Sequence, residues 1–262
     1  MAADVGASAS CSQRLVLLGA SNLTIGLAGV LREASQRWGA PLEVLAAIGH
    51  GRSYGATSRV LFRRLEGILQ CGLWDALDRS PRVETFALVT DIGNDLFYDV
   101  EVEQIVAWVA ESLDRLQSIG ARIVVTGLPV CNLDQLGATR YNLFRRTAFP
   151  RSRLGYDAVR RVALELDVRI ARLAAERALA HVRPEASWYG FDPIHVRRAA
   201  RAQVWRRVLG ALDQRAPRGA SIAPRLRDWL SLMPERRWLM GVEQRRAQPC
   251  WHHRDALALS LY

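Results

Sequence analysis

Short apolar runs alternate with longer amphipathic segments over most of this chain. The apolar runs are rich in Val, Leu and Ile on both faces, which is typical of strands buried within a parallel sheet. They predict strands at about 14–19, 42–48, 83–90 and 121–127, with a fifth strand near 179–183. The amphipathic segments predict helices at about 23–38, 56–70, 101–119, 153–180 and 196–213.

The segment 101–119 has the clearest helical pattern. Val102, Ile105, Val109 and Leu113 recur at helical spacing, and Gly120 is well placed to end the helix. Strands that alternate with helices of this kind favour a doubly wound α/β protein. The pattern therefore predicts a three-layer α/β/α sandwich around a parallel sheet.

The length of 262 residues suits one α/β domain with additions. Residues 1–13 are small and polar and lack the apolar core of a signal peptide, so we expect a disordered arm. The α/β domain is expected over 14–213. Residues 214–262 are interpreted as a linker, 214–224, followed by two short amphipathic helices. We expect these helices to pack against the same chain, and the alternatives are a lid, a dimer contact or a membrane-surface helix. The sequence has no run of 18 uncharged apolar residues, so we expect no transmembrane segment.

Glycine and small polar residues follow the predicted strands directly. The chain has Gly19-Ala20-Ser21 after the first strand, Gly49 to Ser53 after the second and Asp91 to Asp95 after the third. Working groups of doubly wound proteins gather at the carboxyl ends of the strands. We therefore expect these loops to converge in space.

These loops and a later Asp192-Pro193-Ile194-His195 turn contain the groups that ester hydrolysis requires. Ser21 is the candidate nucleophile, His195 the candidate base and Asp192 the carboxylate that orients His195. The candidate oxyanion donors are the backbone amides of Ser21 and Gly51 and the side-chain amide of Asn94.

In this order, the motifs resemble those of the SGNH (GDSL-type) hydrolases, a family of esterases and lipases on a flavodoxin-like α/β/α sandwich. The resemblance covers about residues 14–210 and implies a sheet of about five strands, no metal and no organic cofactor. Ala20 and Ile92 depart from the family pattern, which has aspartate and glycine there. The matches are Gly19-Ala20-Ser21 to the Gly-Asp-Ser turn, Gly51 to the oxyanion glycine, Asn94 to Gly-x-Asn-Asp, and Asp192 and His195 to Asp-x-x-His.

The resemblance implies a serine esterase that hydrolyses a small or acylated ester through an acyl-enzyme. A binding protein with little activity and an acyltransferase on the same site are the alternatives. Ser21 taken alone also suits a helix N-cap, although Asn22 can serve as that cap. His50, Phe97 and Trp188 are the candidate substrate contacts, and the alternative for the aromatic residues is structural packing.

The net charge of +10 changes this interpretation little. The chain has no lysine, so all 36 basic residues are arginines, and they are scattered over the predicted helices. We therefore expect no nucleic-acid partner, and the pattern leaves the oligomeric state open. Cys11, Cys71, Cys131 and Cys250 lie far apart, which argues against a metal knuckle and favours a reducing, cytoplasmic location.

Overall fold

Alternate residues of the first strand, β1 (Gln13–Leu18), enter two different hydrophobic cores. Leu15 and Leu17 pack in one core, whereas Val16 and Leu18 pack in the other. This follows from the two-residue period of a strand, which sends successive side chains to opposite faces. The central sheet is therefore buried on both faces, as the apolar runs predicted.

The computed structural model describes residues 12–132, 136–150, 152–216 and 219–262, so most of the expected arm, 1–13, lies outside the described residues.

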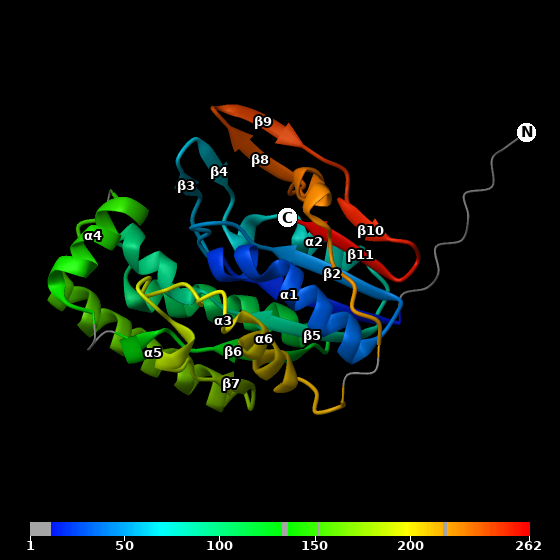
Figure 1. The fold of residues 1–262 in the computed structure, drawn as a ribbon, viewed down its shortest axis with the longest axis horizontal. Coiled ribbons are helices and arrows are strands. Elements are labelled where there is room, and N and C mark those ends of the chain that lie inside the picture. Colours follow the sequence, from blue (N-terminus) through cyan, green and yellow to red (C-terminus); the bar gives the residue numbers. More distant parts are fainter. Residues whose placement is uncertain (1–11, 133–135, 151, 217–218) are drawn as a thin grey trace, which may run out of the picture.

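The central sheet has seven strands in the order β10-β11-β2-β1-β5-β6-β7 (Figure 1). All neighbouring pairs are parallel except β10 with β11. The five strands expected from the sequence form the flavodoxin-like order within it. The strands besides β1 are β2 (Leu42–Ala47), β5 (Glu84–Val89), β6 (Arg122–Thr126), β7 (Ala180–Val182), β10 (Trp251–His253) and β11 (Leu257–Leu261).

Helices cover both faces of this sheet, and the predicted three-layer α/β/α sandwich is confirmed (Figure 1). One face packs against α1 (Ser21–Trp38) and α6 (Arg201–Gly210). The other packs against α2 (Leu73–Arg79), α3 (Val102–Ser118) and α5 (Tyr156–Glu176). The remaining helix, α4 (Ala138–Ala148), joins a smaller aromatic core. None of the described helices is long and apolar enough to cross a membrane.

A helix expected over 56–70 is absent, and that prediction is wrong. The segment instead forms β3 (Ser58–Val60), β4 (Arg63–Leu65) and a 3-10 turn, Ile68–Gln70. β4 pairs with β8 (Arg236–Leu239), and Arg63 and Arg64 lie opposite Leu239 and Trp238, far along the chain. This long-range pairing overrides a local pattern that suits a helix.

The C-terminal region also differs from the expectation, because residues 225–262 form strands rather than two amphipathic helices. After a 3-10 helix, Leu226–Ser231, β8 and β9 (Val242–Arg245) complete a four-stranded sheet in the order β3-β4-β8-β9. β10 and β11 then extend the central sheet, and Leu257, Leu259 and Leu261 are buried there. β11 therefore supplies part of the core through leucines that alternate at the two-residue period of a strand.

Candidate active site

Ser21 lies where β1 passes directly into α1. A side chain at Gly19 has no room, because an added Cβ would lie 2.9 Å from side-chain atoms of Leu23 and Thr90. The strand therefore turns tightly, and Ser21 becomes the first residue of the helix. β1 has β2 on one side and β5 on the other, and the chain order reverses between them. Ligands of doubly wound folds bind at this reversal.

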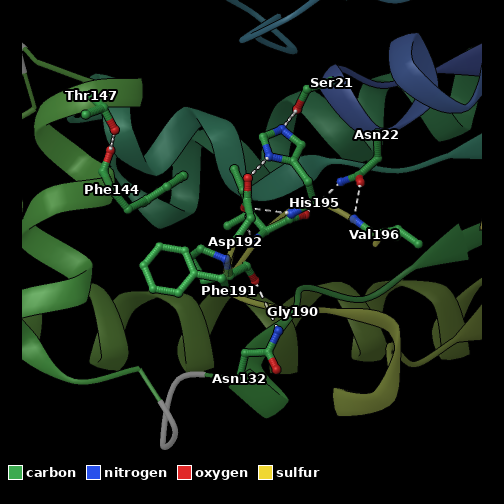
Figure 2. Close-up of polar contacts among 12 residues, drawn as sticks. Ser21, Asn22, Asn132, Phe144, Thr147, Gly190, Phe191, Asp192, His195 and Val196 are labelled. Carbon is green, nitrogen blue, oxygen red and sulfur yellow. Dashed lines mark hydrogen bonds and ion pairs between the residues drawn. The ribbon is translucent and has the colours of Figure 1, made fainter. Parts of the chain in front are cut away.

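The side chains of Ser21, His195 and Asp192 form a continuous hydrogen-bonded chain (Figure 2). Nε2 of His195 lies 2.8 Å from Oγ of Ser21, and Nδ1 lies 2.6 Å from Oδ2 of Asp192. The other carboxylate oxygen of Asp192 accepts the backbone amides of Ile194 and His195, at 3.0 and 3.1 Å. The short Asp-x-x-His turn thus orients both its carboxylate and its imidazole.

The charge state of Asp192 sets the direction of these hydrogen bonds. Its burial alone would raise the pKa, but the hydrogen bond and charge of His195 and the two backbone amides together hold the pKa below its ordinary value. An ionised carboxylate only accepts hydrogen bonds, so Nδ1 of His195 donates to it. In the neutral imidazole, Nε2 is then the acceptor, and the hydroxyl of Ser21 donates to it.

Asn22 holds the loop of His195 from both sides. Its Nδ2 donates to the carbonyl of Ile194 at 2.9 Å, and its Oδ1 accepts the amide of Val196 at 2.8 Å (Figure 2). One side chain therefore bonds the residues before and after His195. Because Asn22 follows Ser21 directly, the relative position of nucleophile and base is set through a single residue.

Asp91 lies two residues after the end of β5 and supports the positions of Ser21 and Asn22 at the start of α1. Its carboxylate accepts the amides of Ala20 and Asn22, at 2.8 and 3.0 Å, and Nδ2 of Asn22 at 2.8 Å. A carboxylate is stabilised at the amino end of a helix, where amides lack partners. The cap of α1 comes from this neighbouring loop rather than from the side chain of Ser21 or Asn22, the two caps that the sequence allowed. The Gly-Asp-Ser pattern has an aspartate where this chain has Ala20. The carboxylate of Asp91 lies at the same turn, because it accepts the amide of Ala20.

A cavity of about 680 Å³ opens beside this chain of hydrogen bonds. Ser21, His195, Gly51, His50 and Phe97 all line it, so the structure brings these predicted residues together. Much of the remaining wall is aromatic or aliphatic. Arg59 adds a positive charge to the wall. The apolar and aromatic part is formed by Val60, Leu61, Tyr98, Phe149 and Ile194.

Gly51 adopts a left-handed conformation, with φ of +64°, at the wall of this cavity. An added Cβ would lie 2.6 Å from Val60 and 2.7 Å from the hydroxyl of Tyr98, so only glycine fits. The Tyr98 hydroxyl donates to the carbonyl of Gly51, and burial raises its pKa, so it stays protonated. This contact fixes the orientation of the loop.

Asn94 lies on an adjoining cavity of about 80 Å³ rather than on the wall of the larger one. Phe97 and Ile194 line both cavities, which places Asn94 next to the larger site. Its Nδ2 is buried and has no hydrogen-bond partner among the described residues. Buried donors are usually paired, so an unpaired donor beside a cavity is available to a ligand.

Asp95 is fully buried directly after Asn94, and burial raises its pKa to about 6. Its Oδ2 accepts the amide of Tyr54, at 3.0 Å, and thereby ties the loop after β5 to the loop after β2. Both loops carry candidate oxyanion donors, and this bond fixes their separation.

His50 lines the same cavity as Ser21, and its pKa lies below the ordinary value because of desolvation and the charges of Arg63 and His195. Trp188, the third candidate contact, is buried in the core under α1 and α6 and lines a different cavity.

The sequence analysis missed Asn132, whose Nδ2 donates to the carbonyl of Pro193 (Figure 2). Among the described residues, no group of three His, Cys, Asp or Glu side chains is arranged to hold a metal ion.

Known proteins are similar to this chain in structure rather than in sequence. No family model and no curated protein matches the sequence. The acetyl xylan esterase AlAXEase is 10% identical, with a TM-score of 0.52, and 76% of this chain covers 98% of that one. A G-D-S-L family lipolytic protein from Veillonella parvula is 9% identical, with a TM-score of 0.50, and 78% of this chain covers 100% of it. A provisionally assigned arylesterase from Agrobacterium tumefaciens is 15% identical, with a TM-score of 0.54, and 78% of this chain covers 100% of it.

These likenesses define the class of fold. The chain has the α/β/α fold of the SGNH (GDSL-type) hydrolases, as its motifs predicted. The neighbouring structures are matched over almost their whole length, whereas about a fifth of this chain lies outside the match. The hydrolase fold is therefore complete here, and the chain carries further structure beyond it.

Proposed function

We propose that this protein is a serine esterase with Ser21 as nucleophile, His195 as general base and Asp192 as its orienting carboxylate. The observation that carries the proposal is the hydrogen-bonded chain from Ser21 Oγ through His195 to Asp192, with distances of 2.8 and 2.6 Å, at the wall of a large cavity. A nucleophile, a base and a group that orients the base constitute the requirement for this chemistry.

In the first half-reaction, Oγ of Ser21 attacks the ester carbonyl carbon while Nε2 of His195 takes the hydroxyl proton. The ester C–O bond then breaks, and His195 gives the proton to the departing alcohol. In the second half, water attacks the acyl carbon with His195 again as base, and the acid leaves as Ser21 regains its proton. Asp192 stabilises the charged imidazole in both halves.

The developing oxyanion requires donors, and we assign the amides of Ser21 and Gly51 and the side-chain amide of Asn94. Ser21 begins α1, and amides in the first turn of a helix have no partner inside the helix. The unpaired Nδ2 of Asn94 supports its inclusion. Each such donor typically contributes about 10²–10³-fold to the rate.

The cavity supports an ester whose acyl or alcohol part is apolar. Its wall includes Phe97 and Phe149, whose rings stack with centroids 4.4 Å apart. Neutral His50 beside the nucleophile adds one polar contact. A volume of about 680 Å³ exceeds the need of an acetyl group and suits a larger substrate.

The first experiment compares hydrolysis of p-nitrophenyl esters of increasing chain length by the wild type, Ser21→Ala and Ser118→Ala. Ser118 is an exposed serine of α3 and serves as the matched control. We expect kcat to fall at least about 10³-fold in Ser21→Ala only, as losses of a triad member do. Equal activity in the wild type and Ser21→Ala would refute the assignment of the nucleophile.

If all three proteins are inactive toward these esters, a fluorophosphonate probe separates the remaining cases. Labelling that requires Ser21 means that the nucleophile is activated and the test esters are poor substrates. No labelling of the folded wild type would contradict the esterase proposal.

A further inference from the structure

The four-stranded sheet β3-β4-β8-β9 ends in two turns that lie side by side. These strands stand together apart from the helices of the sandwich (Figure 1). β3 and β4 are joined through Leu61 and Phe62, and β8 and β9 through Met240 and Gly241. The amide of Met240 donates to the carbonyl of Phe62 at 2.8 Å, which connects the two turns.

These turns expose an unusual amount of apolar surface. Leu61 is 92% exposed, Met240 75% and Phe62 71%. Five of the nine large exposed hydrophobic residues found among the described residues gather here. Contiguous apolar surface of this kind marks a site of interaction. We call it the hairpin tip, and its members are Leu61, Phe62, Leu239, Met240 and Val242.

The backbone of the turns does not favour these residues. Leu61 has φ of 52° and Met240 of 51°, a region that bulky side chains seldom adopt. Met240 and Gly241 both have positive φ, and a hairpin turn of this form favours Asn-Gly. Local folding therefore does not explain the apolar side chains at these two positions.

The hairpin tip is surrounded by positive charge. Residues 58–65 and 236–245 contain six arginines and one acidic residue, Glu243, which is paired with Arg236 and Arg245. Arg59, Arg63 and Arg64 line a hollow of about 390 Å³ together with Phe62, Trp238, Met240 and their neighbours. Within the part of the chain that the structure describes, Arg59 has no acidic partner, and its side chain is exposed.

We propose that the hairpin tip docks on an anionic lipid surface, with its apolar side chains in the acyl boundary and its arginines against the lipid phosphates. Apolar residues beside a basic cluster are the combination that binds such surfaces. A second copy of the chain would bring two like-charged faces together in a two-fold contact, which is unfavourable. Nucleic acid would account for the arginines but leave the apolar tip unused.

The hairpin tip adjoins the cavity of Ser21, because Arg59 and Leu61 line both that cavity and the arginine-lined hollow. Docking would therefore bring the mouth of the cavity close to the lipid. The docking proposal concerns binding alone and does not depend on the esterase proposal.

The test is flotation with vesicles of phosphatidylcholine alone or with phosphatidylglycerol added. It compares the wild type, Phe62→Ser/Met240→Asn, and the control Leu164→Gln/Val168→Gln, which removes two exposed apolar side chains from α5. Asn suits the positive φ of residue 240, so the tip variant is expected to fold, and its unfolding curve checks this.

We expect the wild type and the control to float with the anionic vesicles and the tip variant to bind at least about ten-fold more weakly, since it loses two large apolar contacts. Added salt should weaken binding. The proposal is overturned if the wild type does not float, or if the tip variant floats equally well. Lipid-free dimerisation lost in the tip variant, or tighter binding to duplex DNA than to vesicles, would overturn it in favour of those partners.

Discussion

The side chains of Ser21 and His195 meet across 174 positions of the sequence, and Asn22 sets where they meet. It bonds the carbonyl before His195 and the amide after it, while Asp91 holds Asn22 itself. Asn22 does not touch His195 or the hydroxyl of Ser21 in these contacts. It is therefore a positioning residue of the proposed triad.

At this scale, we expect Asn22→Ala to lower kcat about 10–100-fold and to leave KM almost unchanged, because misplacing the base raises the barrier to the chemical step more than it affects binding. Steady-state kinetics below the unfolding temperature of each variant measure both constants. Thr24→Ala is the control, since the hydroxyl of Thr24 donates to the carbonyl of Ala20 in the same turn. An unchanged kcat, or a loss confined to KM, would contradict the positioning role.

The loops that follow β2 and β5 act together at the scale of elements. The loop after β5 begins with Asp91 in a left-handed conformation and continues as a 3-10 helix, Ile92–Tyr98, that carries Asn94 and Asp95. Asp95 reaches the amide of Tyr54, and Tyr98 reaches the carbonyl of Gly51, so two bonds join this loop to the loop after β2. The proposed oxyanion donors from the two loops are thereby held as one unit.

A pH-dependent stability follows from the buried Asp95. Its pKa is raised to about 6 in the folded protein, so the folded state binds more protons than the unfolded state between about pH 4 and 6. Stability therefore falls as the pH rises through this window. At 1.36 kcal/mol per pKa unit, the loss is about 2–3 kcal/mol.

Asp95→Asn removes this titration and keeps an oxygen that accepts the amide of Tyr54. We expect the free energy of unfolding of the variant, relative to the wild type, to rise by about 2–3 kcal/mol between pH 4 and 7. Urea unfolding at several pH values measures it. Asp78→Asn, at an exposed residue of α2, is the matched control and should leave the difference small. A constant difference between Asp95→Asn and the wild type would show that Asp95 does not carry the proton.

At the scale of the whole molecule, the C-terminal strands complete the fold. β11 pairs with β2 at one end of the parallel series, and its leucines enter the core that α1 and α6 cover. The carbonyl of Tyr262 accepts a hydrogen bond from the fully buried guanidinium of Arg52, one residue beyond Gly51. The C-terminal region therefore supports the loop that carries a proposed oxyanion donor.

This arrangement predicts unequal effects for two C-terminal leucines. Leu259 is fully buried in β11, whereas Leu239 is 36% exposed at the hairpin tip. We expect Leu259→Ala to lower the free energy of unfolding by about 2–5 kcal/mol and Leu239→Ala by less than about 1 kcal/mol. Urea unfolding compares the two. Similar small effects would mean that β11 is dispensable to the core.

Local patterns in the sequence were sufficient for the central strands, the major helices and the hydrolase fold. A strand buried on both faces must be apolar throughout, and β1, β2, β5 and β6 carry that signature within the chain itself. The sequence also named Ser21, Asp192 and His195 as candidates, because their motifs follow strands or form one short turn, and the structure brings their side chains together. The information for each of these features lies within a few neighbouring residues.

Tertiary structure alone decided the features that depend on distant partners. The segment 56–70 forms strands because β8 pairs with β4, and Asp91 caps α1 because β5 lies beside β1. Asn22 positions His195 for the same reason, since its partners lie 172 and 174 residues away. The hairpin tip, likewise, exists only where two remote turns meet. A local pattern specifies which surface a segment can bury, whereas the packing of the whole chain selects the partner that buries it.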